Sequence, residues 1–133
     1  MTRYLAPPFI QGSISRGRSV EQFLGGYMDG DEPALRWVEI RPEPNGVALL
    51  LHQVYDEGDE DFLDVYDFTD LDGESDEGDG PAAEHHLPTL EDALSLAGEL
   101  YGADPGRFVN EGMIQDEYRD YLQRRTSQLP LHG

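Results

Sequence analysis

The middle of the chain alternates apolar runs with turn residues, a pattern typical of β-strands joined by short connections. Residues 35–41 are rich in β-branched and aromatic side chains, and residues 47–55 are almost wholly apolar, as in a central strand that is buried on both faces. Asn45 and Gly46, which both tolerate positive φ, predict a hairpin between these strands. Residues 62–68 predict a third strand, so we expect a β-meander.

Helices are predicted before and after this meander in the sequence. Residues 90–101 repeat apolar side chains at helical spacing, with Thr89 suited to the N-cap and Gly102 to the residue after the C-cap. A last helix is predicted from about residue 115 to residue 125, because its apolar side chains also recur at helical spacing. A short helix is predicted over residues 19–30, where a serine and a glutamine have the spacing of a capping box.

The other segments lack a clear periodicity. Two consecutive prolines and several Gly and Ser residues predict that 1–18 is an extended lead-in. Residues 70–88 have almost nothing to bury and predict a mobile acidic loop. We expect an edge strand at 107–109 and a frayed tail at 126–133. The chain therefore predicts a single α+β domain over 1–133, in which helices pack mainly on one face of an antiparallel β-meander of three to five strands.

Charge is the most unusual property of the sequence. The chain has 28 acidic residues against 9 arginines, no lysine, and a formal net charge of −19. Between Pro42 and Gly106 there are 19 acidic residues and no basic residue. Such a surface repels nucleic acid and anionic membranes and attracts basic proteins. We therefore expect a basic protein partner, and neither nucleic acid nor membrane; the oligomeric state stays open.

Composition excludes several other classes. The chain has no cysteine, so it can form neither a disulfide nor a thiolate metal site. The absence of lysine excludes Schiff-base chemistry and a phosphate-binding P-loop. The first residues lack the apolar core of a signal peptide, and no run approaches the roughly 18 apolar residues of a membrane span. These features favour a cytoplasmic protein.

No motif indicates catalysis. The acidic run fits an EF-hand loop in no register. His85 and His86 are adjacent in the sequence, so their side chains diverge and are poorly placed to share a metal ion. His52 lies in the predicted central strand, where a carboxylate such as Asp64 could tune it, but a hydrogen-bonded structural histidine is the more common case. We predict no catalytic residue, no metal site and no cofactor.

The remaining feature is a base-free acidic region in which aromatic side chains stand beside carboxylates. This combination suits a surface that binds a partner rich in arginine or lysine. The sequence thus predicts a small acidic protein-binding domain, in its most concrete form a bacterial immunity or antitoxin-type protein that neutralises a basic toxin such as a nuclease. The expected contact acids are Asp56, Asp59, Glu60, Asp61, Asp64, Asp67, Asp70 and Asp72, with Trp37 and Tyr66 as anchors.

Two other functions stay open at the level of the sequence. One is a housekeeping domain whose acidic surface only keeps the protein in solution. The other is a metal-dependent or small-ligand enzyme that uses His52. The first predicts that reversing several acids between residues 56 and 79 leaves the function unchanged, and the second, in which strand-end carboxylates would assist His52, predicts that a divalent ion stabilises the fold.

Overall fold

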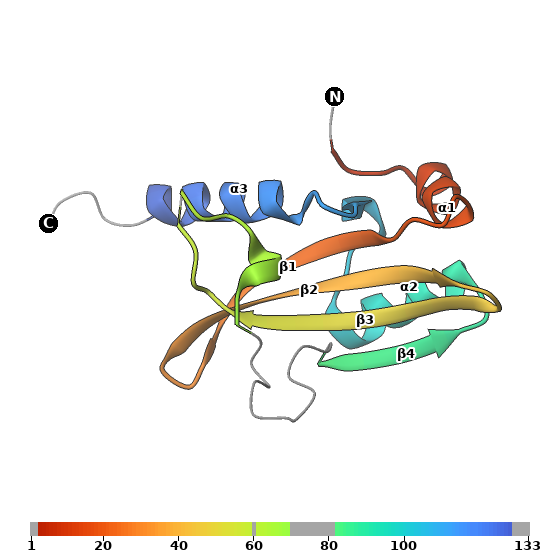
Figure 1. Cartoon of the computed structure of the whole chain (residues 1–133), viewed down its shortest axis with the longest axis horizontal. Helices are drawn as coiled ribbons and strands as arrows, with labels where there is room; N and C mark the ends of the chain where they lie inside the picture. Colours follow the sequence, from red (N-terminus) through yellow and green to blue (C-terminus); the bar gives the residue numbers. More distant parts are fainter. Residues whose placement is uncertain (1–2, 60, 70–81, 129–133) are drawn as a thin grey trace, which may run out of the picture.

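In the computed structural model, which describes residues 3–59, 61–69 and 82–128, five strands form one antiparallel sheet and three helices pack around it (Figure 1). The strands are β1 Val20–Asp29, β2 Glu32–Glu43, β3 Gly46–Tyr55, β4 Ala83–Leu87 and β5 Val109–Asn110. Their order in the sheet is β4-β3-β2-β1-β5. The helices are α1 Pro7–Ser15, α2 Leu90–Tyr101 and α3 Ile114–Gln128. The predicted α+β class with an antiparallel meander is confirmed.

The strands bury side chains on both faces of the sheet. Val38 and Leu51 are paired across β2 and β3 and belong to a hydrophobic cluster to which α1 and α2 contribute. Trp37, the neighbour of Val38, belongs to a second cluster, to which α3 contributes. Because successive side chains of a strand point to opposite faces, the two clusters lie on opposite sides of the sheet. Two of the three helices thus contribute to the same cluster.

Several predicted elements are confirmed at close to their expected bounds. The hairpin between β2 and β3 is confirmed, but its turn lies one residue earlier than expected: Glu43 pairs with Gly46, the first residue of β3, so the two turn residues are Pro44 and Asn45. Helix α2 begins after Thr89, whose hydroxyl accepts a hydrogen bond from the backbone of Asp92 at 3.1 Å, and ends at Gly102 in the left-handed conformation. The predicted edge strand is β5, which pairs with the start of β1.

The predicted extended lead-in over 1–18 is wrong, because residues 7–15 form α1; residues 1–2 lie outside the described part of the chain. The two consecutive prolines occupy the first turn of this helix, where backbone N–H groups have no partner within a helix and proline removes nothing. Ile10 and Ile14 bury the inner side of α1 in the first cluster. The prolines therefore begin a helix, and the prediction was wrong.

The predicted helix over 19–30 is also wrong, since this stretch contains β1. The Ser19 hydroxyl does not cap a helix; it donates to the carboxylate of Glu39 on β2 at 2.8 Å. The register of β1 against β2 shifts between Phe23 and Gly25, as at a β-bulge. Two adjacent glycines weaken the helical alternative, and pairing with the long strand β2 overrides it.

Residues 62–68 do not form the predicted third strand. A single bridge pairs Asp59 with Phe62, and a 3₁₀ turn follows at Val65–Asp67. Val65 and Phe68 are buried in the second cluster. These apolar side chains therefore pack in the cluster to which α3 contributes and do not extend the sheet.

The strand beside β3 is β4, which lies within the predicted mobile loop 70–88. That prediction is wrong for residues 83–87, and residues 70–81 lie outside the described part of the chain. At the other end, α3 continues to Gln128, so residues 126–128 of the predicted frayed tail are helical. Residues 129–133 also lie outside the described part.

Candidate functional site

The acidic segment, which we define as residues 56–59 and 61–69, leaves the end of β3 and packs against α3 (Figure 1). The buried ring of Phe68 meets that of Tyr118 edge-on, with centroids 5.5 Å apart. Asp56, at the start of the segment, accepts a hydrogen bond from the Tyr118 hydroxyl. One residue of α3 thus holds both ends of the acidic segment.

Backbone and side-chain bonds also join the two ends of the segment directly. The backbone N–H of Tyr55 donates to the carbonyl of Thr69 at 2.9 Å. The Glu57 carboxylate accepts from the backbone N–H of Thr69 at 2.5 Å and from its hydroxyl at 2.9 Å. Compact loops with close ends, packed by their own side chains, present a defined surface. The acidic segment is a loop of this kind.

Tyr66 is the aromatic side chain that the segment presents most clearly, with 45% of the residue exposed. Its hydroxyl donates to Glu21 Oε1 at 2.6 Å and accepts from the backbone N–H of Gly112 at 3.1 Å. Its ring meets the Trp37 ring edge-on, with centroids 5.8 Å apart. Burial of the hydroxyl and the nearby charge of Glu21 raise the pKa of Tyr66. An exposed ring is therefore held in one position from beneath.

Four aspartates of the acidic segment differ in their exposure, and two of them are crowded together. Asp59, Asp61 and Asp67 are exposed, whereas Asp64 is half-buried and accepts from the backbone N–H of Tyr66 at 3.2 Å. The charge of Asp64 raises the pKa of the exposed Asp67. Within the described ranges, no ion pair involves any of these four aspartates. The segment thus offers negative charge that no arginine side chain in the described part of the chain neutralises.

The structure separates the predicted contact residues into three groups. Asp59, Asp61, Asp67 and Tyr66 are exposed on the segment, and Asp56 and Asp64 are half-buried. Trp37 is only 3% exposed and cannot be a surface anchor; its ring supports Tyr66 instead. Three further predicted acids lie outside the described residues, namely Glu60, Asp70 and Asp72.

Phe62 is an exposed aromatic side chain that the sequence analysis did not single out. It is 41% exposed and lies edge-on to Phe68, with ring centroids 5.1 Å apart. The prediction of a strand over 62–68 placed this ring in a sheet. The one sequence signal for its exposure was that Phe62 directly follows a run of acidic residues that ends at Asp61.

Beneath Tyr66 lies a pair of buried carboxyl groups. Glu21 and Glu39 face each other across β1 and β2, and they are 3% and 9% exposed. Like charges at such positions repel each other, and the structure separates the two pKa values. Burial raises the pKa of Glu21. Burial also acts to raise that of Glu39, but hydrogen bonds from His52, Ser19 and Arg41 outweigh it and lower the pKa to about 2.

His52 belongs to this buried network. Its Nε2 lies 2.9 Å from Glu39 Oε1, and its ring stacks on Trp37 with centroids 5.1 Å apart. The carboxylate beside His52 is therefore Glu39, and the sequence analysis had suggested Asp64. The sequence analysis missed the indication that Glu39 gives. A glutamate among apolar residues of a strand is expected to be buried, and a buried charge requires partners such as His52.

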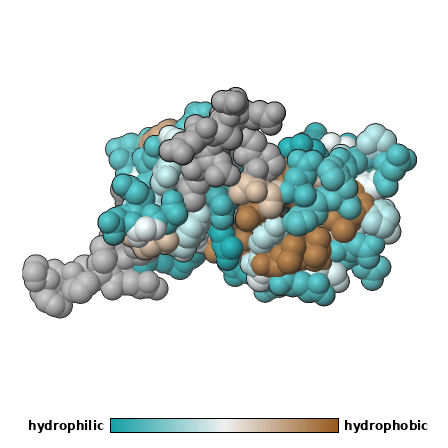
Figure 2. All heavy atoms as spheres, turned by 90° about the horizontal axis from the view of Figure 1, so that it is seen from below, coloured by the Kyte–Doolittle hydropathy of each residue, from teal (hydrophilic) through white to brown (hydrophobic). Residues whose placement is uncertain are grey.

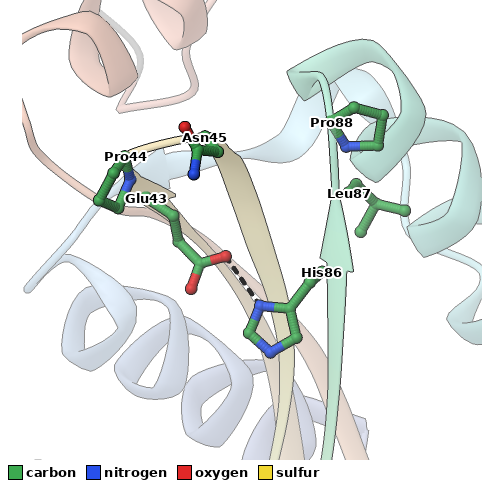
Figure 3. A pocket seen from close by; sticks show the side chains of 6 residues that line it. All are labelled: Glu43, Pro44, Asn45, His86, Leu87 and Pro88. Atoms are coloured by element: carbon green, nitrogen blue, oxygen red, sulfur yellow. Dashed lines mark hydrogen bonds and ion pairs between the residues drawn. The ribbon is translucent and has the colours of Figure 1, made fainter.

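A shallow hollow lies at the opposite end of β3 from the acidic segment, between the β2–β3 hairpin and the end of β4 (Figure 3). Figure 3 shows the Glu43 carboxylate directed at the His86 ring, and Glu43 Oε1 lies 2.8 Å from His86 Nδ1. No group of three or more His, Asp or Glu side chains within the described residues could hold a metal ion. The hollow is lined by Glu43, Pro44, Asn45, His86, Leu87 and Pro88.

Hydrophobic surface is also unevenly distributed. Figure 2 shows it gathered on the half of the molecule that contains β4 and α2. Leu87, Leu90 and Leu94 are half-buried there, and Leu100 is 50% exposed. This surface does not include the acidic segment.

In comparison with known proteins, no family model, no curated protein and no solved structure matches the chain. Among the described residues, no helix combines the length and the apolar character that crossing a membrane requires. The acidic segment and the residues that hold it therefore carry the functional argument.

Proposed function

We propose that this chain is a small acidic protein-binding domain and that its acidic segment docks onto a basic protein. In its most concrete form, the protein is a bacterial, cytoplasmic immunity or antitoxin-type inhibitor that neutralises a basic toxin such as a nuclease. The charge of −19 supports a basic partner, because it speeds encounter with cationic proteins and opposes binding to nucleic acid.

The observation that carries the proposal is the combination of fixed aromatic side chains with unneutralised carboxylates. Tyr66 is held from beneath by Glu21 and Trp37, and Phe62 stands exposed on the same segment. Large aromatic rings that are already ordered lose little entropy on binding and dominate the binding free energy of many interfaces. The surrounding charge then selects a partner of opposite sign.

The crowding of Asp64 and Asp67 supports the same conclusion. Their mutual repulsion raises the pKa of Asp67 in the free protein. An arginine or lysine of the partner that docks between them would relieve this repulsion, so the segment gains more from a cation than isolated carboxylates would. Such steering weakens as salt screens the charges.

The test is capture of a basic partner from a lysate of the source organism by the immobilised protein, at low and at high salt. We expect one predominant cationic protein at low salt. The variant D61N/D67N should bind it about tenfold more weakly, which corresponds to about 1.4 kcal/mol. The matched control E91Q/E99Q removes the same charge from exposed positions on α2 and should bind as tightly as the unmodified chain.

Phe62→Ala tests the aromatic contribution separately, because it leaves the charge unchanged. We expect weaker binding with an unaltered salt dependence, and a thermal melt confirms that the variant folds. Equal losses in D61N/D67N and E91Q/E99Q would show that only net charge matters and would overturn the assignment of the acidic segment. Failure to recover any cationic protein would overturn the function itself.

A further inference from the structure

Strand β4 stands at one edge of the sheet and is joined to β3 by five residue pairs, from Val47↔Leu87 to Leu51↔Ala83. Short edge strands are among the segments that open most easily in a folded protein. Two adjacent histidines add further attachments. His85 Nε2 lies 2.9 Å from the Tyr101 hydroxyl of α2, and His86 lies on the opposite face of the sheet. The imidazole of His85 therefore links β4 to α2 in addition to the strand pairing.

His86 contacts a carboxylate with each of its ring nitrogens. Nδ1 lies 2.8 Å from Glu43 Oε1 on β2, and Nε2 lies 2.7 Å from Glu84 Oε2 on β4 itself. Ionised carboxylates only accept hydrogen bonds, and both imidazole nitrogens donate only in the protonated ring. A neutral His86 could satisfy one of the two contacts and would place a lone pair against the other carboxylate. With both carboxylates ionised, the two contacts can be hydrogen bonds at the same time only when the ring carries the additional proton.

The charged groups on this face favour the protonated ring. The residue paired with His86 on β3 is Ala48, which carries no charge, and the next residue in that row is Arg41 on β2. Arg41 pairs with Glu39 at 3.2 Å. Glu43 and Glu84 are therefore the groups that act most directly on His86 in the described part of the chain. Hydrogen bonds to Glu43 and then to Glu84 raise the pKa of His86 above 6.5, its ordinary value.

The β2–β3 hairpin and the end of β4 are also in close backbone contact. A Cβ atom at Gly46 would lie 2.1 Å from the carbonyl oxygen of Leu87. The backbones of Gly46 and Leu87 are this close only while β4 is paired with β3. Their approach keeps Glu43, at the end of β2, within hydrogen-bond distance of His86 (Figure 3). Docking of β4 and the bond between Glu43 and His86 therefore support each other.

We propose that the paired contacts of His86 with Glu43 and Glu84 form a proton-dependent link that fastens β4 to the β2–β3 hairpin and loosens when the imidazole loses its proton. A histidine with a raised pKa contributes stability that is fully present below the ordinary value and is lost as the pH rises through the value in the folded protein. Loosening also leaves two carboxylates without a counter-charge, so the edge becomes more acidic. The link lies at the other end of β3 from the acidic segment and does not depend on its function.

The test is NMR titration of the histidine rings together with hydrogen exchange of the β4 amides, expressed as protection factors. We expect His86 to titrate above its ordinary value of about 6.5. Over the same pH range, protection of the β4 amides should fall by a factor of up to about five, the range expected for an exposed ion pair. Protection of α2 should stay constant and serves as the internal reference.

The variant H86Q should show the low protection at every pH, because glutamine has no proton to lose in this range. The matched variant H85Q removes the contact with Tyr101 instead; β4 should loosen, but its dependence on pH should remain. The variant E43Q should lower the pKa of His86. Titration of His86 at or below its ordinary value, or equal pH dependence of β4 protection in H86Q and the unmodified chain, would overturn the proposal.

Discussion

At the scale of single residues, the most informative feature is the pair of glutamates buried between β1 and β2. Glu21 and Glu39 are direct cross-strand partners, and two equal charges at such positions could not both remain buried without a cost. Ser19, His52 and Arg41 hold Glu39 as a carboxylate. The polar network beneath Tyr66 therefore uses its two acids differently. Glu21 accepts the hydrogen bond from the Tyr66 hydroxyl and has a raised pKa, whereas Glu39 has a lowered pKa.

This difference predicts how the stability of the protein depends on pH. The pKa of Glu39 is about 2 in the folded protein, below its ordinary value of 4.5. A lowered pKa contributes stability that is present above the ordinary value and lost as the pH falls through the folded-state value. We expect E39Q to be less stable than the unmodified chain at neutral pH by on the order of 3 kcal/mol. The difference should vanish towards about pH 2.

Urea unfolding at a series of pH values measures this difference. The exposed Glu91 provides a control, and E91Q should retain the pH dependence of the unmodified chain. A constant difference between E39Q and the unmodified chain across the whole series would show that the Glu39 carboxylate is not held in its ionised form.

At the scale of elements, the acidic segment packs against the hydrophobic core, although many of its side chains are charged. A Cβ atom at Gly58 would lie 2.4 Å from the Phe62 carbonyl oxygen, 2.4 Å from the Phe68 ring and 2.8 Å from the Tyr118 ring. The loop therefore passes over α3 at a distance that only glycine permits. This contact connects the exposed acidic surface to the packing of the second cluster.

The close approach predicts that Gly58→Ala destabilises the protein by about 1–3 kcal/mol, as overpacking does in other cores. Gly98→Ala is the matched control, because a Cβ there meets only the Ala103 carbonyl oxygen at 3.5 Å, an ordinary contact. Within helix α2, this change should stabilise the protein by about 0.5–1 kcal/mol. Chemical denaturation measures both changes. A neutral Gly58→Ala variant would contradict the packing of the segment on α3.

At the scale of the whole molecule, the acidic groups lie at several places on the surface. Carboxylates are exposed on the acidic segment and at the start of α2, and two more carboxylates flank His86. With a net charge of −19, the folded state brings like charges closer together than the unfolded chain does. Self-repulsion is thus the global cost of such a strongly acidic surface.

This repulsion predicts that salt stabilises the protein. Screening lengths fall from about 30 Å at 0.01 M salt to about 10 Å at 0.1 M salt. We expect sodium chloride over this range to raise the melting temperature by roughly 4 °C, which corresponds to about 1 kcal/mol for a chain of this size. Potassium chloride should have the same effect. A fall in melting temperature, or a response to only one of the two cations, would contradict general screening.

Elements governed by neighbouring residues were predictable from the sequence. The cap at Thr89, the left-handed Gly102 and the hairpin turn before Gly46 each depend on the conformation of a few adjacent residues. The apolar run from 47 to 55 is long enough to indicate a buried strand by itself. Together these signals predicted α2, the central hairpin and the α+β class.

The sequence by itself also determined the charge of the protein and its concentration between residues 42 and 106, since these require only the residue types. Only the tertiary structure decided that residues 20–29 pair with β2, that Val65 and Phe68 join the cluster of α3, and that Glu21 faces Glu39. The reason is physical: capping and turn conformation are local interactions, whereas strand pairing and the burial of carboxylates depend on residues that are distant in the chain.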